Sequence, residues 1–543
     1  MKWRYSIVAF VLLFVSLSSG QTYVATNGTP SGNGTSASPW DLQTALNQDL
    51  PVGDTIFIRG GVYSGNYIAR VHGVVVKSYA NERVTIEGNA SASEDISFLL
   101  MSSCSNLTFQ GIEFGSSTRG GSNGIVTQQV NVNFDNVRFI NCVIHDYQNN
   151  VALWREATNA ELYGCIIYNA GYDASDRGHG HSIYAMNQTG RKRIENCIIF
   201  GGYANGVQAY GSATQYADNF TIKGNIIANA GNASSIGGGW NLIAGREGST
   251  SITVGDSVCE NMTYRSQNNG NFGGVAFGWD GGQLNGVLNE NYLVSGMSGD
   301  VALQLVQCTN LTMAGNTIIG SIQGFSPSTY PNNIYFSSRP TSGMTQFLRV
   351  NKYNPSRVNL AVYNWSGNSS VVLSLSGFAS LGDTVRIYNA QNYYGDAPAI
   401  AVVDNSGNIS VSMAGWTIAT PIGGTNSQST FPVFGAFVLA ISKGSNSMVS
   451  TPVNVPEGFD LYPNHPNPFN TQTVIRFRVP KLTQIRLVVS DDLGRQISVL
   501  ADDWFSAGAY DFRFDGTNLA SGVYYCQLVM EGTRLTQKMV LLK

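Results

Sequence analysis

Short segments that alternate apolar and polar residues recur along the chain between Asn106 and Ile319. Each copy then passes through a Gly or Asn into a second apolar pair. The copies are, in order, NLTFQGIEF, NVRFINCVI, NAELYGCII, KRIENCIIF, NFTIKGNII, DSVCENMTY, GVLNENYLV and NLTMAGNTII. A period of two is typical of a β-strand, and Gly or Asn marks a bend. Each copy therefore predicts a strand, a bend and a second strand, with no helical pattern between copies.

The spacing of equivalent positions predicts how these strands are arranged. The residue after the bend is, in successive copies, Ile112, Cys142, Cys165, Cys197, Asn225, Asn261, Asn291 and Asn316. The intervals vary, as in a solenoid whose turns carry insertions. A coiling chain also supplies the long crossover that parallel strands require. We therefore predict an all-β chain in which residues 21–324 form a right-handed parallel β-helix, with one coil per repeat.

Two residue types occupy the position after the bend. Asn side chains on successive coils, about 4.8 Å apart, can hydrogen-bond to one another along the axis of the solenoid. Three adjacent coils carry Cys142, Cys165 and Cys197 instead. We predict that these thiols form a buried ladder that fills the corner of the solenoid.

The repeat stops near Gly324, and the remaining sequence predicts two further β units. Segments such as VNLAVYNW, SVVLSLSG, TVRIYNAQ and GAFVLAIS are separated by Gly-rich turns and predict a small β-sandwich over residues 325–442. A polar linker over residues 443–456 leads to a last β unit over residues 457–543.

Each coil has a further strand after its variable turn. These strands lie in NVALWREA, HSIYAMNQ, GVQAYGS, NLIAGREG, GVAFGWDG and DVALQLV. Because successive side chains of a strand point to opposite faces, we expect an inward row of Val151, Ile183, Val207, Leu242, Val275 and Val301. The next residues then form an outward row, Ala152, Tyr184, Gln208, Ile243, Ala276 and Ala302. A second outward row contains Trp154, Met186, Tyr210, Gly245, Gly278 and Gln304.

The outward rows combine aromatic rings with polar residues at the strand ends. Sugar rings stack on aromatic faces, and their hydroxyl groups need paired polar groups. We therefore expect this face to bind a glycan through Trp154, Asn187, Gln208, Tyr210, Trp240 and Trp279. The alternative is that the aromatic rings pack beneath the long turns and that the charged groups are solvated.

Composition narrows the location and the partners. Charged residues make up 12% of the chain, about half the usual share, and there are 61 Gly residues, which favours an extracellular β-rich protein. The net charge of −3 gives no basic field for nucleic acid. Lys2 and Arg4 precede an apolar run and then small residues, which predicts a signal peptide over residues 1–20. That run is shorter than the roughly 20 residues that cross a bilayer, and no later segment predicts a transmembrane anchor. Seven irregularly spaced Cys residues, with no CxxC pair, predict neither a disulfide scaffold nor a zinc site.

The densest group of reactive side chains lies in one turn, where Asp173, Asp176, Arg177, His179 and His181 fall close together. Gly178 and Gly180 would let the backbone approach a ligand. A carboxylate beside His179 would suit that imidazole to acid or base catalysis. His181 could instead point inward, so His179 is the preferred candidate.

Two parts of the chain resemble known families. The opening TYVATNGTPSGNGTSASPWDLQTALNQ, with GDTIFIRGGVYSG and RVTIEG after it, resembles the N-terminal coils of the pectate-lyase-like superfamily. That resemblance implies the coiled fold over residues 21–322 and activity on acidic polysaccharides.

The C-terminal unit carries LYPNHPNPFN, DDLGRQI, SGVYYCQLV and KMVLLK, which together resemble the sorting domain of the bacterial type IX secretion system. His465 and Pro466 interrupt the family's usual YPNPFN motif. The resemblance implies a Bacteroidetes-type bacterium, a C-terminal β-sandwich recognised by the secretion machinery, passage through the outer membrane to the surface or beyond, and removal of the tail.

The leading functional hypothesis is a lyase that cleaves a uronate polysaccharide by β-elimination. Such a site needs a cation to neutralise the uronate carboxylate, a base and an acid. Arg155, Arg177 or Arg246 could supply the cation, with His179 as base and Tyr184 or Tyr210 as acid. Ca²⁺ could replace an Arg if Glu156, Glu247 or Asp280 supplied oxygen ligands. An epimerase would use nearly the same groups.

Two other hypotheses stay open at this point. A glycoside hydrolase would need paired carboxylates, for which Glu156, Glu247, Asp176 and Asp280 are candidates. A non-catalytic surface adhesin would use the same aromatic face, because a fold alone does not establish chemistry.

Overall fold

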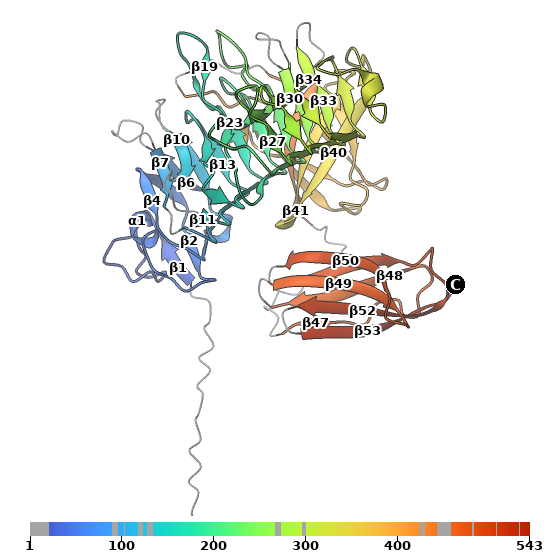
Figure 1. Ribbon diagram of the computed structural model, residues 1–543. Helices are drawn as coiled ribbons and strands as arrows, with labels where there is room; N and C mark the ends of the chain where they lie inside the picture. Colours follow the sequence, from blue (N-terminus) through green and yellow to red (C-terminus); the bar gives the residue numbers. More distant parts are fainter. Residues whose placement is uncertain are drawn as a thin grey trace, which may run out of the picture. The chain divides into compact units, whose positions relative to one another are not determined.

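The computed structural model describes residues 21–88, 96–101, 104–117, 123–127, 134–266, 273–295, 300–422, 424, 429–442, 458–480, 483–505, 508–530 and 533–543. The predicted signal peptide, residues 1–20, and the predicted linker, residues 443–456, lie outside these ranges. The chain divides into two compact units at Gly444 (Figure 1). Within the described ranges, no helix has the length and hydrophobicity needed to cross a bilayer.

Three long parallel sheets form the body of the first unit, and each complete coil contributes one strand to each sheet. Sheet 1 contains β1 (Gln21–Val24), β2 (Thr55–Ile58), β5 (Val75–Ser78), β8 (Thr108–Gln110), β12 (Arg138–Ile140), β16 (Glu161–Tyr163), β21 (Lys192–Glu195), β24 (Phe220–Lys223), β28 (Ser257–Cys259), β32 (Val287–Asn289) and β36 (Thr312–Ala314). Sheet 2 contains β3 (Gly61–Ser64), β6 (Val84–Gly88), β9 (Glu113–Ser116), β13 (Val143–His145), β17 (Ile166–Tyr168), β22 (Ile198–Phe200), β25 (Ile226–Ala228), β29 (Met262–Tyr264), β33 (Tyr292–Val294), β37 (Thr317–Ile319) and β39 (Ile334–Phe336). Sheet 3 contains β4 (Tyr67–Ala69), β7 (Ile96–Leu100), β10 (Asn123–Thr127), β14 (Val151–Leu153), β20 (Ile183–Ala185), β23 (Val207–Gly211), β26 (Leu242–Arg246), β30 (Gly273–Trp279), β34 (Val301–Leu305) and β38 (Ser321–Gln323).

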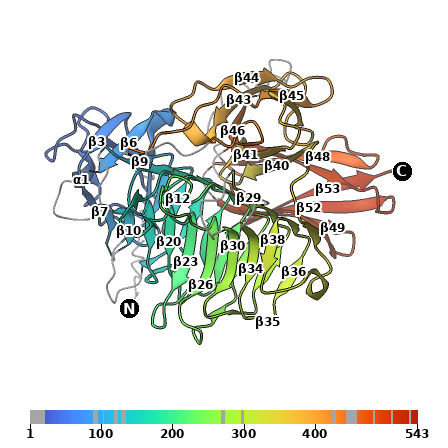
Figure 2. The ribbon, with the colours of Figure 1, turned by 90° about the horizontal axis from the view of Figure 1, so that it is seen from above.

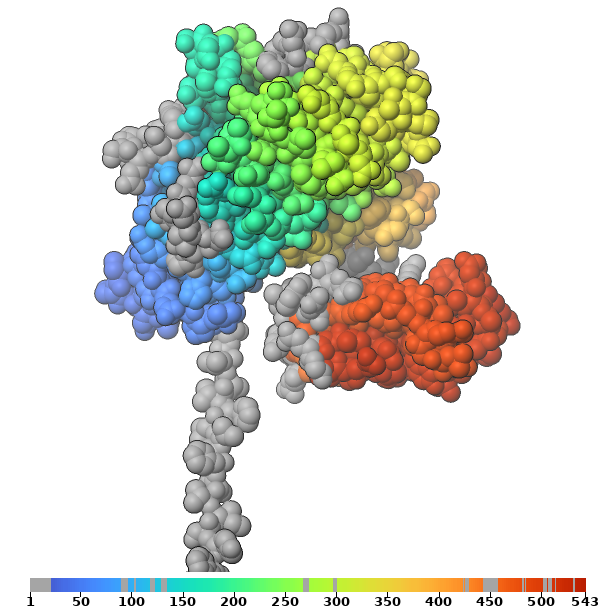
Figure 3. Space-filling model, viewed as in Figure 1, coloured from blue at the N-terminus to red at the C-terminus, as the bar shows by residue number. Residues whose placement is uncertain are grey.

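Shorter elements lie between the strands of the first unit. They are α1 (Leu42–Ala45), the 3₁₀ turns η1 (Tyr79–Asn81), η2 (Pro327–Thr329) and η3 (Ala390–Asn392), and the strand sets β11 (Phe134–Asp135) with β15 (Ala157–Thr158), β18 (Tyr172–Asp173) with β19 (Gly178–His179), and β27 (Thr253–Val254) with β31 (Gln283–Leu284) and β35 (Cys308–Thr309). The body is therefore the right-handed parallel β-helix that the repeats predict. Its successive coils form the colour bands that run from blue to yellow in Figure 3.

The corner between sheets 1 and 2 has the predicted ladder. The side-chain amide of Asn225 donates to Asn261 Oδ1 at 2.9 Å, that of Asn261 to Asn291 at 3.0 Å, and that of Asn291 to Asn316 at 2.8 Å. The backbone N–H of Cys197 donates to Asn225 Oδ1 at 2.9 Å, so the thiol stack continues directly into the Asn ladder. The side chains of Cys142, Cys165 and Cys197 are fully buried, as predicted, and the seven cysteines, which all lie in described residues, form no disulfide.

The solenoid extends beyond the predicted end at residue 324. Asn316 donates its side-chain amide to Asn333 Oδ1 at 2.7 Å, which adds a further step to the ladder. β39 then pairs in parallel with β37. The last described coil therefore ends at Phe336.

An antiparallel β-sandwich completes the first unit. One layer has the strand order β40 (Met344–Asn351), β41 (Asn354–Asn364), β46 (Phe434–Ser442), β43 (Thr384–Asn389) and β44 (Ala399–Val402), and β42 (Ser370–Ser374) pairs with β45 (Asn408–Ser412). The sandwich packs on the outer face of sheet 2, where Tyr363 and Phe434 join one buried cluster with Ile198 and Ile226. Figure 2 shows it along one side of the solenoid, whereas β20, β23, β26 and β30 of sheet 3 lie on the other side.

The second unit, from Ser445 to Lys543, has its own core. One antiparallel sheet contains β47 (Asp460–Leu461), β48 (Gln472–Val479) and β51 (Gly508–Asp515), and the other contains β50 (Gln496–Phe505), β49 (Thr483–Asp491), β52 (Gly522–Met530) and β53 (Thr533–Leu541). Their apolar faces enclose a cluster that includes Phe477, Leu487 and Leu528. This unit is therefore the β-sandwich expected at the C-terminus.

Candidate functional site

The strands of sheet 3 pair in the register that the alternation predicts. Ala152 lies opposite Tyr184, Tyr184 opposite Gln208, and Gln208 opposite Ile243 on successive coils. Farther along the same strands, Tyr210 lies opposite Gly245. The outward row is therefore continuous from β14 to β26.

Four rings gather on the outer face of β14, β20 and β23, and we call them the aromatic cluster: Trp154, His181, Tyr184 and Tyr210. The Tyr184 ring meets the Trp154 ring edge-on at 5.3 Å between centroids and the His181 ring edge-on at 5.5 Å. The Tyr210 ring lies 6.4 Å from that of Tyr184. Edge-to-face geometry is favourable for aromatic pairs, and it leaves the rings tilted with respect to one another on three adjacent coils.

Tyr210 links the cluster to a carboxylate. Its hydroxyl donates to Glu247 Oε2 at 2.9 Å, and both burial and the Glu247 charge raise the pKa of Tyr210. Burial likewise raises the pKa of Tyr184. Both phenols therefore keep their protons at neutral pH and can act as hydrogen-bond donors. Gln208, mostly buried between them, accepts a hydrogen bond from the Asn205 side chain.

His181 lies on the outer side of the coil, next to Tyr184, and does not point inward. Burial, together with charge interactions with Arg177 and His179, lowers its pKa to about 3. Its Nδ1 accepts the backbone N–H of Asn205 at 3.3 Å. The imidazole is therefore neutral at physiological pH, and Nε2 carries the proton.

The β18–β19 hairpin carries the predicted base. His179 Nε2 lies 2.9 Å from Asp176 Oδ1, and the ring stacks on Tyr172 with 5.8 Å between centroids. The hydrogen bond from His179 lowers the pKa of Asp176, which therefore stays ionised and orients the imidazole. The side chain of Arg177 is 57% exposed, and its Nε lies 3.9 Å from Asp176 Oδ2.

Arg246, a predicted cation for the substrate, has a structural role instead. It is buried, and its guanidinium donates to the backbone carbonyls of Ser212, Ala213 and Ile252 at 2.9 to 3.3 Å. It also lies 4.5 Å above the Tyr216 ring. Its donors close the turns around the end of β26, so the prediction that Arg246 contacts substrate is wrong.

Two predicted sugar-binding residues are also buried. Asn187 is fully inaccessible and donates to the carbonyl of Asp218 at 2.6 Å, which ties the end of β20 to the next turn. Trp240 is 4% exposed and packs in a cluster with Ile243, Ala276 and Val301 on the outer side of sheet 3. Trp240 is therefore a packing residue of this outer cluster.

Val301 was expected to point inward, but it belongs to this outer cluster, whereas Ala302 lies in the solenoid core. Leu303, not Val301, pairs opposite Val275, and β34 has a register irregularity between Val301 and Leu303. Such an irregularity rotates the side chains that precede it. The alignment of this coil was wrong by two residues.

Trp279 sits at the end of β30 in an unusual backbone conformation. Its φ is +42°, and that of Gly278 before it is +91°. A left-handed φ is rare for a bulky residue and costs about 1–3 kcal/mol. The conformation turns the indole against Trp240, edge-on at 6.3 Å, and leaves it partly exposed at the rim of the face.

The end of β14 carries an ion pair, and a buried lysine contacts its backbone. Arg155 Nε pairs with Glu156 Oε1 at 2.9 Å, and Arg155 is one-third exposed. The buried ammonium of Lys192 donates to the carbonyls of Leu153, Trp154 and Met186, and burial lowers its pKa to about 7. Lys192 therefore fixes the backbone that carries Trp154.

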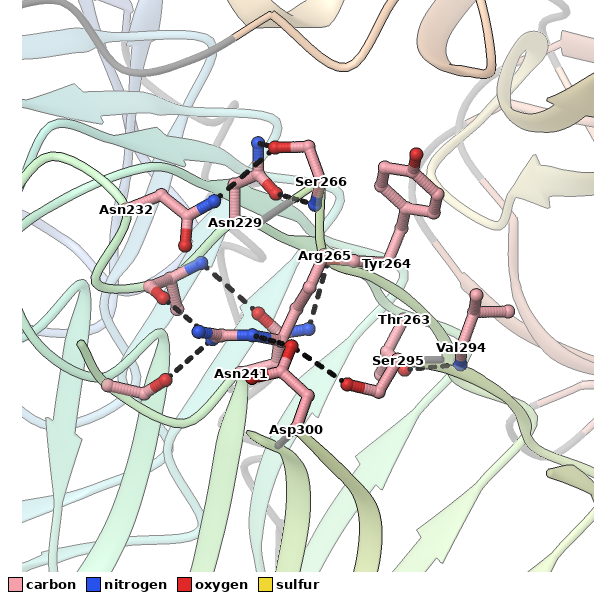
Figure 4. Close-up of polar contacts among 12 residues, drawn as sticks. Asn229, Asn232, Asn241, Thr263, Tyr264, Arg265, Ser266, Val294, Ser295 and Asp300 are labelled. Atoms are coloured by element: carbon pink, nitrogen blue, oxygen red, sulfur yellow. Dashed lines mark hydrogen bonds and ion pairs between the residues drawn. The ribbon is translucent and has the colours of Figure 1, made fainter. Parts of the chain in front are cut away.

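A fully buried ion pair holds the turns that lead into β26, β30 and β34 (Figure 4). Arg265 Nε lies 3.1 Å from Asp300 Oδ2, and Arg265 Nη1 donates to the carbonyls of Ala230 and Gly239. Ser295 adds a hydrogen bond to the same Asp300 oxygen at 3.0 Å. These contacts anchor the starts of the sheet 3 strands.

No group of three His, Cys, Asp or Glu side chains that could hold a metal ion occurs in the described part of the chain. Glu156, Glu247 and Asp280 therefore do not form a calcium site by themselves. Asp280 instead accepts the backbone N–H of Gly248 at 3.1 Å.

A second polar site, on the outer face of sheet 2, was missed from the sequence. Glu113 on β9 accepts from Arg83, Thr85 and His145, and His145 Nδ1 lies 2.7 Å from Asp146 Oδ2. These residues border a cleft of about 450 Å³ lined by Gly61, Val62, Arg83, Thr85, Glu87, Glu113, Gly115, Ser116, Ser117, His145 and Ile422. We call it the sheet 2 cleft.

A signal for this site was present in the repeats. Glu113 pairs opposite Val143, and the same position is Ile166, Ile198 and Ile226 in later coils. A carboxylate at a position that is otherwise apolar marks a local change in what covers the sheet. Because its partners come from other coils, the spacing alone could not identify the network.

Solved structures with a similar chain course include the Dettilon tailspike protein, which is 11% identical, with 78% of this chain and 95% of that chain covered and a TM-score of 0.33. A rhamnogalacturonan lyase is 11% identical, with 55% and 87% covered and a TM-score of 0.32. XylC in complex with xylose is 9% identical, with 77% and 99% covered and a TM-score of 0.39. Similarities this low give no information on a shared activity, and curated protein sequences give no significant match.

The C-terminal unit gives a more specific result. The family model described as the secretion system C-terminal sorting domain matches residues 462–542. The match covers β48 to β53 and the motifs around LYPNHPNPFN and KMVLLK. This chain therefore ends in a secretion system C-terminal sorting domain, which directs it to the cell surface or beyond.

Proposed function

We propose that this exported protein binds an acidic polysaccharide on the outer face of sheet 3 and cleaves it by β-elimination. The observation that carries the proposal is the aromatic cluster, which spans three adjacent coils, with its attached carboxylate, Glu247, on the fourth. Strands of one sheet lie about 4.8 Å apart, so the rings of successive coils follow one another along the solenoid axis, with centroids 5.3 and 6.4 Å apart. Tilted rings in a row, with donors and acceptors beside them, suit the alternating faces and hydroxyl groups of a sugar chain.

The reaction assigns a role to each available group. His179, oriented by Asp176 at 2.9 Å, takes the proton from the carbon beside the uronate carboxylate. The electron pair forms a carbon–carbon double bond as the bond to the glycosidic oxygen breaks, and Tyr210 gives its proton to that oxygen. Arg177 or Arg155 neutralises the carboxylate, because Arg246 is buried and donates to three backbone carbonyls.

The test is incubation of the secreted protein with a panel of acidic and neutral polysaccharides. Ultraviolet-absorbing unsaturated ends are expected from an acidic polymer. New reducing ends without that absorbance would replace the lyase with a hydrolase, and binding without cleavage would leave an adhesin. His179→Ala is expected to abolish turnover while the fold stays intact, so retained turnover would remove His179 as the base.

Tyr210→Phe separates binding from chemistry. It keeps the ring and removes the proton, so turnover should fall about 10²–10⁴-fold with binding retained. Tyr388→Phe in the sandwich is the matched control and should change neither. Equal turnover in both variants would exclude Tyr210 as the acid.

One observation favours a hydrolase as the second candidate. Arg246 and Trp279 pair on adjacent strands, so the carboxylates that follow them, Glu247 and Asp280, branch from neighbouring coils. In addition to burial, the charges of Glu247 and Asp280 both raise the pKa of Tyr210. Two carboxylates flanking one site are what a glycosidase requires. Glu247→Gln and Asp280→Asn should then each stop the release of reducing ends, whereas a lyase would keep producing unsaturated ends in the Asp280→Asn variant.

A further inference from the structure

The sheet 2 cleft lies on a different sheet of the solenoid from the aromatic cluster. Three adjacent coils supply its floor through β3, β6 and β9, His145 of β13 extends it, and Ile422 of the sandwich region borders it. Its volume of about 450 Å³ falls within the range of small-molecule sites, about 300–1,000 Å³. Gly115 leaves room for the His145 ring, since a Cβ there would lie 2.7 Å from His145 Cε1.

The floor of the cleft is a closed network of charges. Arg83 donates to both oxygens of Glu113, at 2.8 and 2.9 Å, while Thr85 donates at 2.7 Å and His145 Nε2 lies at 3.2 Å. Although burial opposes it, hydrogen bonds from His145, Arg83 and Thr85 lower the pKa of Glu113 to about 2. With every acceptor position of its carboxylate used, Glu113 has no capacity for proton transfer or nucleophilic attack. The cleft is therefore built for binding.

The groups that face the opening complement one another. Arg83 is 54% exposed and uses Nε and Nη2 for Glu113, so Nη1 takes no part in that pair. Glu87 lies on the same face of β6 and accepts a hydrogen bond from Ser64 at 3.0 Å. Val62, 55% exposed, and Ile422 supply apolar surface. A donor, an acceptor and small apolar walls fit a ligand that has both hydroxyl groups and C–H faces.

The charges of the cleft argue against an anionic ligand. Hydrogen bonds and charge interactions with Asp146 and Glu113 outweigh burial and raise the pKa of His145 to about 9, so the imidazole is cationic at neutral pH. The cations Arg83 and His145 then face the anions Glu87, Glu113 and Asp146. The local field is neutral to slightly negative, which disfavours a uronate.

We propose that the sheet 2 cleft binds a neutral saccharide of one to a few units and has no catalytic role. The site is independent of the proposed cleavage on sheet 3. An exported enzyme with both sites would hold a mixed polysaccharide at a neutral stretch while it acts on an acidic stretch, and two linked contacts strengthen binding without any new interaction.

The test is calorimetric titration of the secreted protein with cellotetraose, xylotetraose, mannotetraose and galactotetraose. At least one is expected to bind, and Val62→Trp, which fills the cleft, should weaken that binding at least tenfold. Glu87→Gln should weaken it about tenfold, as for loss of a charged hydrogen-bond acceptor. Val372→Trp is the matched control, because Val372 is a similarly exposed valine, 61%, on β42 of the sandwich. It should bind as the wild type does.

Two outcomes would overturn the proposal. The first is binding of none of the four sugars, and the second is undiminished binding in Val62→Trp. If the second is accompanied by loss of binding in Tyr210→Ala, the neutral sugar occupies sheet 3. Failure of β-elimination on sheet 3 leaves these titrations unaffected, so the two proposals fail separately.

Discussion

The outer faces of sheets 2 and 3 belong to the same coils but differ in chemistry. Along sheet 2 the outward positions of the middle coils are apolar, among them Ile166, Ile198 and Ile226, and the sandwich covers them. Along sheet 3 the outward positions of β20 and β23 carry Tyr184, Gln208 and Tyr210, and the sandwich lies on the other side. The inner faces of both sheets contribute to one continuous core. In a solenoid, therefore, the inward positions specify the fold, and the outward positions specify what each face contacts.

The largest expected loss of stability comes from a substitution on the covered face of sheet 2, compared with one on the outer face of sheet 3. Ile198→Asp would bury an unpaired charge between sheet 2 and the sandwich, and should destabilise the first unit by more than about 4 kcal/mol. Tyr210→Ser on sheet 3 should cost about 1 kcal/mol, because it removes a partly exposed ring and one hydrogen bond. Urea unfolding of the two variants measures both. Similar losses would mean that the two faces do not differ in coverage.

The next effect concerns the starts of the sheet 3 strands. Asp300→Ala leaves the buried guanidinium of Arg265 without its ion-pair partner, and should cost about 3–5 kcal/mol. Removing one member of the exposed Arg59–Glu82 pair, by Arg59→Ala, is the control and should leave the stability nearly unchanged, because solvent screens an exposed ion pair. Thermal unfolding at equal protein concentration compares them. A loss below about 1 kcal/mol for Asp300→Ala would contradict the anchoring role.

A smaller effect on sheet 2 depends on pH. The folded-state pKa of His145 is raised from 6.5 to about 9, so its contribution is fully present below about pH 6.5 and is lost as the pH rises through about 9. The pKa of Glu113 is lowered from 4.5 to about 2, so its contribution is present above about pH 4.5 and is lost as the pH falls through about 2. His145→Gln should therefore cost most, about 3 kcal/mol, between pH 4.5 and 6.5 and much less at about pH 10. Urea unfolding of wild type and variant at the two pH values checks this, and an equal loss at both would exclude the charge network as its cause.

The smallest effect is on binding at sheet 3. Tyr184→Ala removes the central ring of the aromatic cluster and should weaken binding of the acidic polysaccharide about tenfold, equal to about 1.4 kcal/mol. Tyr388→Ala in the sandwich should leave affinity unchanged. Fluorescence titration measures both, and unchanged affinity in Tyr184→Ala would place the substrate elsewhere.

The fold could be predicted from the sequence because the same alternation and the same types of bend residue recur in successive coils of the solenoid. Alternation predicted the inward row at Val151, Ile183 and Val207, and the recurrent Asn and Cys predicted the corner ladder. At Val301 the same rule failed, since apolar residues at 301, 303 and 305 give no sign of an irregularity in β34. Alternation of apolar and polar residues alone therefore does not predict where a strand has a register irregularity.

The site was less predictable, because contacts with neighbouring turns decide whether its side chains are exposed. Arg246 and Asn187 lie at strand ends where exposure was expected, but backbone carbonyl groups of neighbouring turns engage them. His179 and Asp176 are close in sequence, and the hairpin keeps them together. Glu113 and His145, by contrast, meet across coils. Contacts between residues 32 positions apart can be inferred only once the register of the coils is known.

The thiol stack of Cys142, Cys165 and Cys197 can report the local opening of the solenoid. Each sulfur is sealed in the corner of a central coil, and burial raises the pKa of Cys142 and Cys165, which suppresses the reactive thiolate. A thiol reagent can reach these atoms only when their coils part. The rate at which these three cysteines are labelled, followed separately from the partly exposed Cys259 and Cys308, therefore measures how often the middle of the solenoid opens, with no residue changed.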